Sequence, residues 1–286
     1  MSDDDVAAVQ ATGLGARYGH AWALRDCTFT VPRGAVAVLA GPNGAGKSTV
    51  LAIAAGLTVP ATGYMTVLGA DVTARMNPHA AYVSQTRTLP TGLTVGEIIR
   101  MVRAFNTTRW APGDLITRLI QDRGIPLKAK AGTLSDGARS LVSICLALAR
   151  RPDVLLLDEP VAALDPLARD EVLRLLMAEV ADRAMTVLLS SHTPGELRDV
   201  TDHLVLLGRN TIALTGPTDD VLAEHRILTG PATTDPPIAT DTVIHRTNTE
   251  RQTILLVRGH TDPTPGWNQQ TPDLDTIILG YLRATR

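Results

Sequence analysis

Residues 41–49 read GPNGAGKST and directly follow the apolar run AVAVLA at 35–40. The run predicts a buried strand and KSTVLAIAAGL predicts a helix, so the glycine-rich segment is a strand-to-helix turn. It matches the pattern G-x-x-x-x-G-K-[ST] in full. Glycines in this arrangement turn successive backbone N–H groups toward phosphate oxygens, and the helix dipole adds positive character. The segment therefore predicts an α/β fold with a phosphate-binding loop.

Each position of this loop suits a role in nucleotide binding. Lys47 is expected to reach the β- and γ-phosphates, and the Ser48 hydroxyl is the expected Mg²⁺ ligand. The other loop residues predicted to bind the nucleotide are Gly41, Asn43, Gly44, Ala45, Gly46 and Thr49. A chance glycine-rich turn is the competing interpretation, and the flanking strand and helix argue against it.

A pair of carboxylates ends a second apolar run, VLLLDEP at 154–160. Asp158 ends the predicted strand, where it is placed to hold Mg²⁺ through water. Glu159 points elsewhere and is placed to polarise an attacking water. A solvated strand end is the competing interpretation of this pair. Together with the phosphate loop, the two acids predict a nucleotide-hydrolysing site.

Short apolar runs alternate with helical patterns from about residue 25 to 215. Strands are predicted at 35–40, 80–84, 153–157, 185–191 and 203–208. Their near-continuous apolar character suits a sheet that is covered on both faces. Helices are predicted at 94–104, 112–123, 137–150, 166–182 and 217–226. The predicted fold is an α/β P-loop NTPase core with a mostly parallel sheet, an antiparallel β edge and an inserted helical lobe at about 86–151.

The sequence predicts a second, smaller unit at its end. Residues 1–228 are predicted to form the ATP-binding domain, and the Thr-, Pro- and Asp-rich stretch 229–241 a linker. Residues 242–286 alternate like a β-hairpin and close with PDLDTIILGYLRA, a short amphipathic helix.

Charge and composition exclude some classes of protein. The net charge of −2 and the pI of about 6.4 give no basic footprint, so we expect no nucleic-acid partner. No window has 18 consecutive apolar residues, and the acidic start lacks the features of a signal peptide. Cys27 and Cys145 lack metal-ligand spacing, which predicts two buried free thiols in a reducing compartment.

In this order the motifs resemble those of the ATP-binding subunits of ABC transporters, over about residues 11–225. GPNGAGKST and VLLLDEP are similar to the family's Walker A and Walker B motifs. The resemblance implies that Tyr18 stacks on adenine and that Gln85 senses Mg²⁺ and the γ-phosphate. Asp165, in ALDP, matches the D-loop, and His192 matches the switch histidine that contacts the γ-phosphate. Taken alone, a single Tyr or a strand-end His is more often structural.

The stretch TLSDGARS at 133–140 lies where the family carries LSGGQ. Ser135 and Gly137 match the signature, whereas Asp136 and Ala138 replace a glycine and the glutamine. In the family, cassettes dimerise head to tail, so each ATP lies between one cassette's Walker motifs and the other's signature. A first-turn acid stabilises its helix by about 0.3–1 kcal/mol, but one aimed at the γ-phosphate would repel it. Both orientations stay open.

The same geometry leaves two kinds of dimer open. In a homodimer both ATP sites would meet the deviant signature. In a heterodimer this chain's Walker motifs would face a different signature, and only the partner's site would meet Asp136. The substitution is therefore a hypothesis for asymmetry if the partner is a different chain.

The resemblance implies a subunit that binds and hydrolyses ATP with Mg²⁺ and powers a membrane transporter through dimer closure. Its permease subunits would be on a separate chain, and it would lie at the cytoplasmic face of the membrane through them. The ending PDLDTIILGYL resembles the tail of the ABC-2 type branch, which favours an exporter. The alternatives are an ATP-binding regulatory subunit with weak turnover and a soluble ABC ATPase not linked to transport. Asp136 and Ala138 favour the regulatory subunit. The net charge of the chain opposes a soluble ABC ATPase that acts on nucleic acid.

Overall fold

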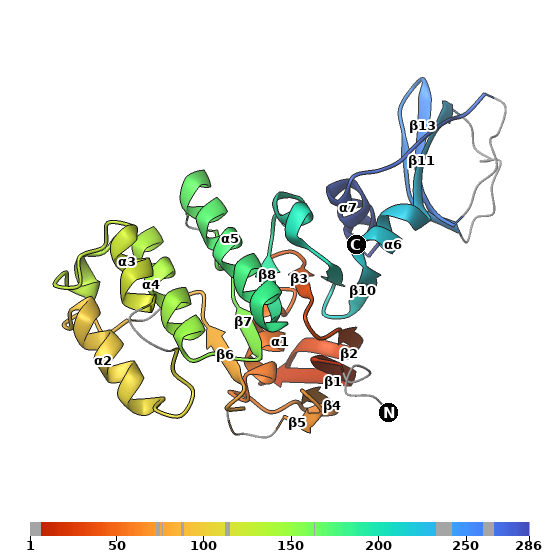
Figure 1. Cartoon of the computed structure of the whole chain (residues 1–286). Coiled ribbons are helices and arrows are strands. Elements are labelled where there is room, and N and C mark those ends of the chain that lie inside the picture. The colour runs from red at the N-terminus through yellow and green to blue at the C-terminus, as the bar shows by residue number, and fades with distance from the viewer. Residues whose placement is uncertain are drawn as a thin grey trace.

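The computed structural model describes residues 7–72, 75, 77–86, 89–111, 115–162, 164–232, 242–259 and 266–285. At its centre is a six-stranded sheet in the order β10-β9-β3-β8-β7-β6 (Figure 1). These strands are β3 (Val36–Ala40), β6 (Ala80–Val83), β7 (Val154–Leu157), β8 (Thr186–Ser191), β9 (His203–Leu207) and β10 (Ile212–Pro217). All neighbours pair in parallel except β10, which is antiparallel to β9. The predicted sheet with an antiparallel edge is confirmed.

A smaller antiparallel sheet covers the helix that follows the phosphate loop, α1 (Lys47–Ala54). Its strands, in the order β2-β1-β4-β5, are β1 (Val9–Tyr18), β2 (Ala21–Val31), β4 (Thr62–Val67) and β5 (Ala70–Asp71). Phe29 and Met65 of this sheet share one buried cluster with Leu51 of α1 and Leu39 of β3. Packing on both sides therefore fixes α1, and with it the loop at its start.

The chain between β6 and β7 forms a helical lobe beside the central sheet, as predicted (Figure 1). It contains α2 (Val95–Phe105), α3 (Leu115–Asp122), the short 3₁₀ helix η2 (Ala131–Thr133) and α4 (Asp136–Ala149). A capping box begins α2, because Thr94 and Glu97 each accept a hydrogen bond from the other's backbone N–H. The predicted start of the second helix, at 112, lies outside the described residues.

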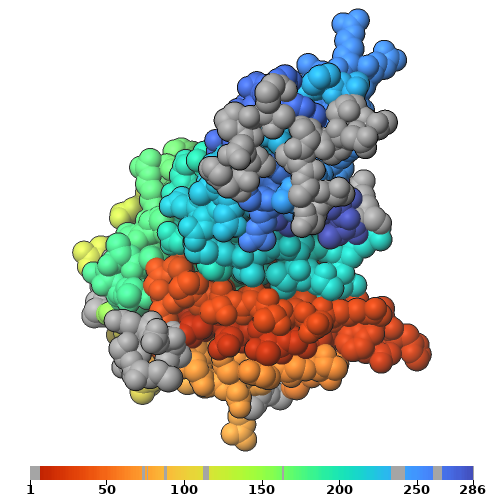
Figure 2. All heavy atoms as spheres, turned by 90° about the vertical axis from the view of Figure 1, so that its right-hand side faces the viewer, coloured from red at the N-terminus to blue at the C-terminus, as the bar shows by residue number. Residues whose placement is uncertain are grey.

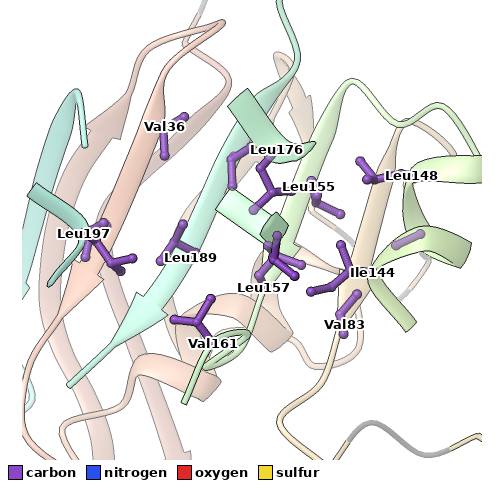
Figure 3. Close-up of a cluster of buried hydrophobic side chains, with 14 of the residues drawn as sticks. Val36, Val83, Ile144, Leu148, Leu155, Leu157, Val161, Leu176, Leu189 and Leu197 are labelled. Atoms are coloured by element: carbon purple, nitrogen blue, oxygen red, sulfur yellow. The ribbon is translucent and has the colours of Figure 1, made fainter. Parts of the chain in front are cut away.

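Both faces of the central sheet are buried. Leu155 and Leu157 of β7 face a core shared with α4 and with α5 (Pro166–Arg183), whereas Leu156 faces α1. Figure 3 shows the first of these cores, where Ile144 of α4 and Leu176 of α5 point toward the strands. Burial on both faces explains why these strands read as continuous apolar runs rather than as alternating ones.

The C-terminal segment has helices and strands whose bounds differ from the predicted linker at 229–241 and unit at 242–286. It contains α6 (Thr218–Glu224), β11 (His225–Pro231), β12 (Val243–Asn248), β13 (Gln252–Arg258), β14 (Asn268–Gln270) and α7 (Leu274–Ala284). The predicted continuation of a helix to 226 and of a linker from 229 is wrong, because β11 pairs along its whole length with β13. Residues 233–241 of that linker lie outside the described residues. The β12–β13 hairpin and the final helix agree with the expectation.

This unit packs on the main domain. Leu256 of β13 and Ile277 of α7 belong to the same buried cluster as Leu189 of β8. The 3₁₀ helix η3 (Pro194–Val200) contacts α7, and the Gly195 N–H donates a 2.9 Å hydrogen bond to Asp275 Oδ1. Figure 2 shows the blue C-terminal residues above the red band of N-terminal strands, with a cyan segment between them. Among the described helices, none has both the length and the apolar character needed to cross a bilayer.

Candidate nucleotide-binding site

The loop between β3 and α1 depends on its glycines. Gly41 has φ of 150° and Gly46 has φ of 104°, in the region that favours glycine. A Cβ on Gly41 would lie 2.6 Å from Leu207 O, and one on Gly46 would lie 2.6 Å from Ala23 O. Gly46 is also the N-cap of α1 and supplies no side-chain cap, so the first-turn N–H groups face the loop. This arrangement is a helix N-terminus suited to an anion.

Lys47 lies at the centre of this loop. Its Nζ donates to Gly41 O at 2.8 Å and to Pro42 O at 3.2 Å, and lies 3.7 Å from Glu159 Oε1. The side chain is buried, and burial lowers the pKa of Lys47 although the Glu159 and Asp158 charges act in the opposite direction. A phosphate in the loop would supply the negative charge that a buried ammonium requires.

The remaining loop residues divide between surface and interior. Asn43 and Gly44 are exposed at the tip of the loop, and Ser48 is exposed on the first turn of α1. Ala45 and Thr49 are buried. The exposed Ser48 hydroxyl therefore suits the predicted role of a metal ligand beside the phosphates, because it remains open to solvent.

The two acids lie directly beyond the end of β7. Ser190 of β8 donates a 2.8 Å hydrogen bond to Asp158 Oδ1 and accepts one of 2.8 Å from the Glu159 N–H. Tyr82 of β6 approaches Asp158 Oδ2 at 3.5 Å, and burial, reinforced by Asp158, raises the pKa of Tyr82 to about 12. The chain turns sharply at Glu159, whose φ is 48°. Sequence reasoning missed Ser190 and Tyr82; the signal for Ser190 was a polar residue in an apolar strand.

His192 follows β8 and completes the cluster. Its Nδ1 lies 3.0 Å from Glu159 Oε2, and its side chain is about half exposed. The phosphate loop, the acid pair and the histidine thus come together at the carboxyl ends of neighbouring parallel strands β3, β7 and β8. Ligands of open α/β sheets bind at this edge.

Two further predicted residues are exposed and lie at or just after the end of their strands. Tyr18 ends β1 and is 59% exposed, and Gln85 is exposed just after β6. Within the described part of the chain, no hydrogen bond or ion pair joins either of them to Lys47 or to the acid pair. Their predicted contacts with a nucleotide and with Mg²⁺ stay predictions.

The signature residues form a helix start on the lobe. Ser135 is the N-cap of α4, and its Oγ accepts a 3.2 Å bond from the Ala138 N–H. Asp136 is the first helical residue, with a side chain that is 75% exposed and lies 3.5 Å from Arg139 Nη1. The acid therefore points into solvent beside a cation of its own helix. Gly137 follows in the first turn of α4, and its role as a signature glycine stays a prediction.

Asp165 also caps a helix. Its Oδ1 accepts 3.0 Å hydrogen bonds from the backbone N–H groups of Leu167 and Ala168 at the start of α5. Leu167 beside it is 70% exposed. The predicted D-loop residue is thus fixed structurally at the surface, next to an apolar side chain.

Comparison with known proteins agrees with these features. A family model described as ABC transporter matches residues 24–162. The thiamine import ATP-binding protein ThiQ of Chelativorans sp. (strain BNC1) is 35% identical, over 76% of this chain and 90% of that protein. The probable multidrug ABC transporter ATP-binding protein YbhF of Escherichia coli (strain K12) is 31% identical, over 76% of this chain and only 38% of that protein. A solved ATP-binding subunit of an ABC transporter superposes with a TM-score of 0.65 at 28% identity, covering 75% of this chain and 92% of that one.

Proposed function

Because the chain belongs to the ABC transporter family of ATP-binding, ATP-hydrolysing subunits, we propose that it powers a membrane permease carried on a separate chain. The observation that best supports this is the placement of one carboxylate, Glu159, between Lys47 and His192. In the proposed mechanism Lys47 binds the β- and γ-phosphates, and Glu159 takes a proton from the attacking water. His192 orients Glu159 and contacts the γ-phosphate.

The donor set fits Mg²⁺. Ser48 offers an exposed hydroxyl oxygen, Asp158 a carboxylate at a strand end, and Gln85 an exposed amide oxygen. Mg²⁺ prefers such oxygen ligands and keeps several waters and substrate phosphates in its shell, so it needs few protein groups. When bound with ATP, the ion would neutralise charge that develops on the phosphates.

We further propose that ATP binding closes a head-to-tail dimer, with Ser135 and Gly137 completing the partner's site. The exposed Asp165 and Leu167 next to the site support a contact surface there. The chain would lie at the cytoplasmic face of the membrane through its permease. We propose export, from the resemblance of α7 to the ABC-2 type tail. The names of the relatives do not support this direction, because most of them name import, of thiamine, molybdenum or methionine, and the multidrug protein's name states no direction.

A regulatory subunit with weak turnover is the second candidate. It is favoured by Asp136 and Ala138, which replace signature residues. The exposed Asp136 side chain and its ion pair with Arg139 weaken the argument for a regulatory subunit, because a solvated acid beside a cation repels a phosphate less.

The test is ATP hydrolysis by the purified chain with Mg²⁺, measured for wild type, Glu159→Gln and the control Glu171→Gln. Glu171 is a partly exposed carboxylate paired with Arg123, away from the site. We expect Glu159→Gln to lower turnover by about 10²-fold or more and Glu171→Gln to match wild type. ATP binding without turnover in wild type, also after addition of membranes, would favour the regulatory candidate.

The partner and the direction need a second experiment. We expect a polytopic membrane protein to co-purify with the tagged chain from detergent-solubilised membranes. In inverted vesicles that contain both, ATP added outside reaches the chain. Accumulation of a fluorescent cationic drug such as ethidium would support export. Release of preloaded thiamine, with no drug uptake, would support import and contradict our proposal.

A further inference from the structure

One buried hydroxyl joins both acids of the site. Ser190 is fully buried in β8, the strand between β3 and β7. Because a backbone N–H only donates, Ser190 Oγ must accept from Glu159. Its own hydrogen is then directed to Asp158 Oδ1, because an ionised carboxylate only accepts. The two bonds, each 2.8 Å long, form one chain from the Glu159 backbone to the Asp158 side chain.

The backbone at this point requires such support. Glu159 has φ of 48°, in the left-handed region that side chains other than glycine rarely adopt. The Asp158 N–H is bound to Val83 O at 2.9 Å and the Glu159 N–H to Ser190 Oγ. Neighbouring strands on both sides of β7 therefore hold the turn that sends the two carboxylates in different directions.

The hydrogen bond from Ser190 also distinguishes the two oxygens of Asp158. Oδ1 accepts a hydrogen bond of ordinary length, 2.8 Å, whereas Oδ2 has Tyr82 Oη at 3.5 Å, near the limit for a hydrogen bond. The side chain is almost fully buried, so this bond largely determines its orientation.

We propose that Ser190 is a positioning residue, which sets the Asp158 carboxylate for Mg²⁺ and the Glu159 turn for catalysis. The inference rests on the proposed function, because the metal is the Mg²⁺ that accompanies ATP. Residues that orient a metal ligand change metal affinity or activity by about 10–100-fold when they are removed. Ser190 is expected to act on the Mg²⁺-dependent part of ATP binding and not on the phosphate loop itself.

A matched control lies on the same strand and the same face. Thr186 is also buried, and its Oγ1 also accepts from a backbone N–H, that of Gly34 at 2.9 Å. It lies at the opposite end of β8, away from the two acids. Removal of either hydroxyl leaves a buried N–H without its partner, so Ser190→Ala and Thr186→Val should both lower the unfolding temperature. Only Ser190→Ala should change how strongly the affinity for ATP depends on Mg²⁺.

The experiment measures the dissociation constant of ATP by calorimetry, once with EDTA and once with Mg²⁺. For wild type and Thr186→Val we expect the same gain in affinity from Mg²⁺. For Ser190→Ala we expect an unchanged value in EDTA and a gain reduced by about 10-fold or more. Ser190→Thr keeps the hydroxyl and should recover the gain. If Ser190→Ala fails to fold, Ser190→Cys replaces it, because a thiol has a similar size but is a weak donor.

A second measurement, made without metal, accompanies the calorimetry. Hydrogen exchange of the Glu159 amide, in EDTA, should be faster in Ser190→Ala than in wild type and in Thr186→Val. An unchanged gain from Mg²⁺ in Ser190→Ala would overturn the inference. So would an equal loss of affinity in EDTA and in Mg²⁺, which would indicate general damage to the loop. A wild type that gains nothing from Mg²⁺ would instead overturn the proposed function, and this inference with it.

Discussion

Glu159 Oε2 lies 3.0 Å from His192 Nδ1, so two residues 33 positions apart in the chain share one hydrogen bond. They meet because β7 and β8 are adjacent parallel strands, and each residue lies just beyond its strand's carboxyl end. The other carboxylate oxygen lies 3.7 Å from Lys47 Nζ. The proposed base for hydrolysis thus lies between a cation on one side and an imidazole on the other.

We predict that His192→Ala lowers ATP turnover by about 10-fold or more and leaves ATP affinity within about twofold. In the proposed mechanism the imidazole orients Glu159, whereas the loop and Lys47 would bind most of the phosphate groups. The check is steady-state hydrolysis together with ATP binding. The double variant with His192→Ala and Glu159→Gln should have a turnover little below that of Glu159→Gln alone, because the effects of residues that act as a unit are not additive. Fully multiplicative losses would contradict this coupling.

Asp136→Asn should lower the free energy of unfolding by about 0.5 kcal/mol. The change removes a first-turn charge from the helix dipole and an i,i+3 pair with Arg139 that is largely solvated. Urea unfolding measures this change in free energy. The control is Asp182→Asn in the last turn of α5, where removal of a negative charge should raise the free energy of unfolding instead. A higher free energy of unfolding for Asp136→Asn would show that the charge of Asp136 does not stabilise helix α4. A rise in turnover would show that its charge weakens the signature.

Much of the fold was predictable because its central strands are buried on both faces. The runs that contain Leu39 and Leu156 are apolar without interruption, and a strand–loop–helix motif anchors the first of them. The N-terminal sheet was not assigned to residue ranges. The pairing of β1 with β2 contains register shifts between Ala11 and Arg17, which break the regular alternation of a strand.

The site was predictable only in part. The loop and the acid pair follow from motif chemistry, whereas roles for His192 and Gln85 came from family resemblance. Ser190 could not be assigned, since its contact with Asp158 depends on the register of two strands that the sequence leaves undefined. The start of β11 at His225 was missed for a similar reason: its partner strand β13 begins 27 residues further along the chain, at Gln252.

Gly195 and Asp275 should show coupled effects on stability. The Gly195 N–H donates to Asp275 Oδ1, and a Cβ on Gly195 would overlap the same carboxylate. Gly195→Ala and Asp275→Ala should each cost about 1 kcal/mol, and the double variant clearly less than their sum, because the overlap disappears with the carboxylate. Urea unfolding measures the cycle. Leu279→Ala, at an exposed position of α7, is the control and should be additive with Gly195→Ala.

Acid should weaken the packing within the C-terminal unit through His225. Nδ1 donates to Val221 O at 2.6 Å, so Nε2 is the acceptor for the Tyr281 hydroxyl at 3.0 Å. Burial lowers the pKa of His225 below 6.5. The unfolded chain therefore binds a proton more readily, and stability should fall below pH 6.5 by up to about 1.4 kcal/mol per pH unit. His225→Gln should be less stable at pH 7.5 and lose less between pH 7 and 5, in thermal unfolding. Burial also lowers the pKa of His203, so His203 should likewise make stability fall with falling pH. His203→Gln is therefore measured beside His225→Gln. A His225→Gln curve parallel to that of wild type would contradict the assignment.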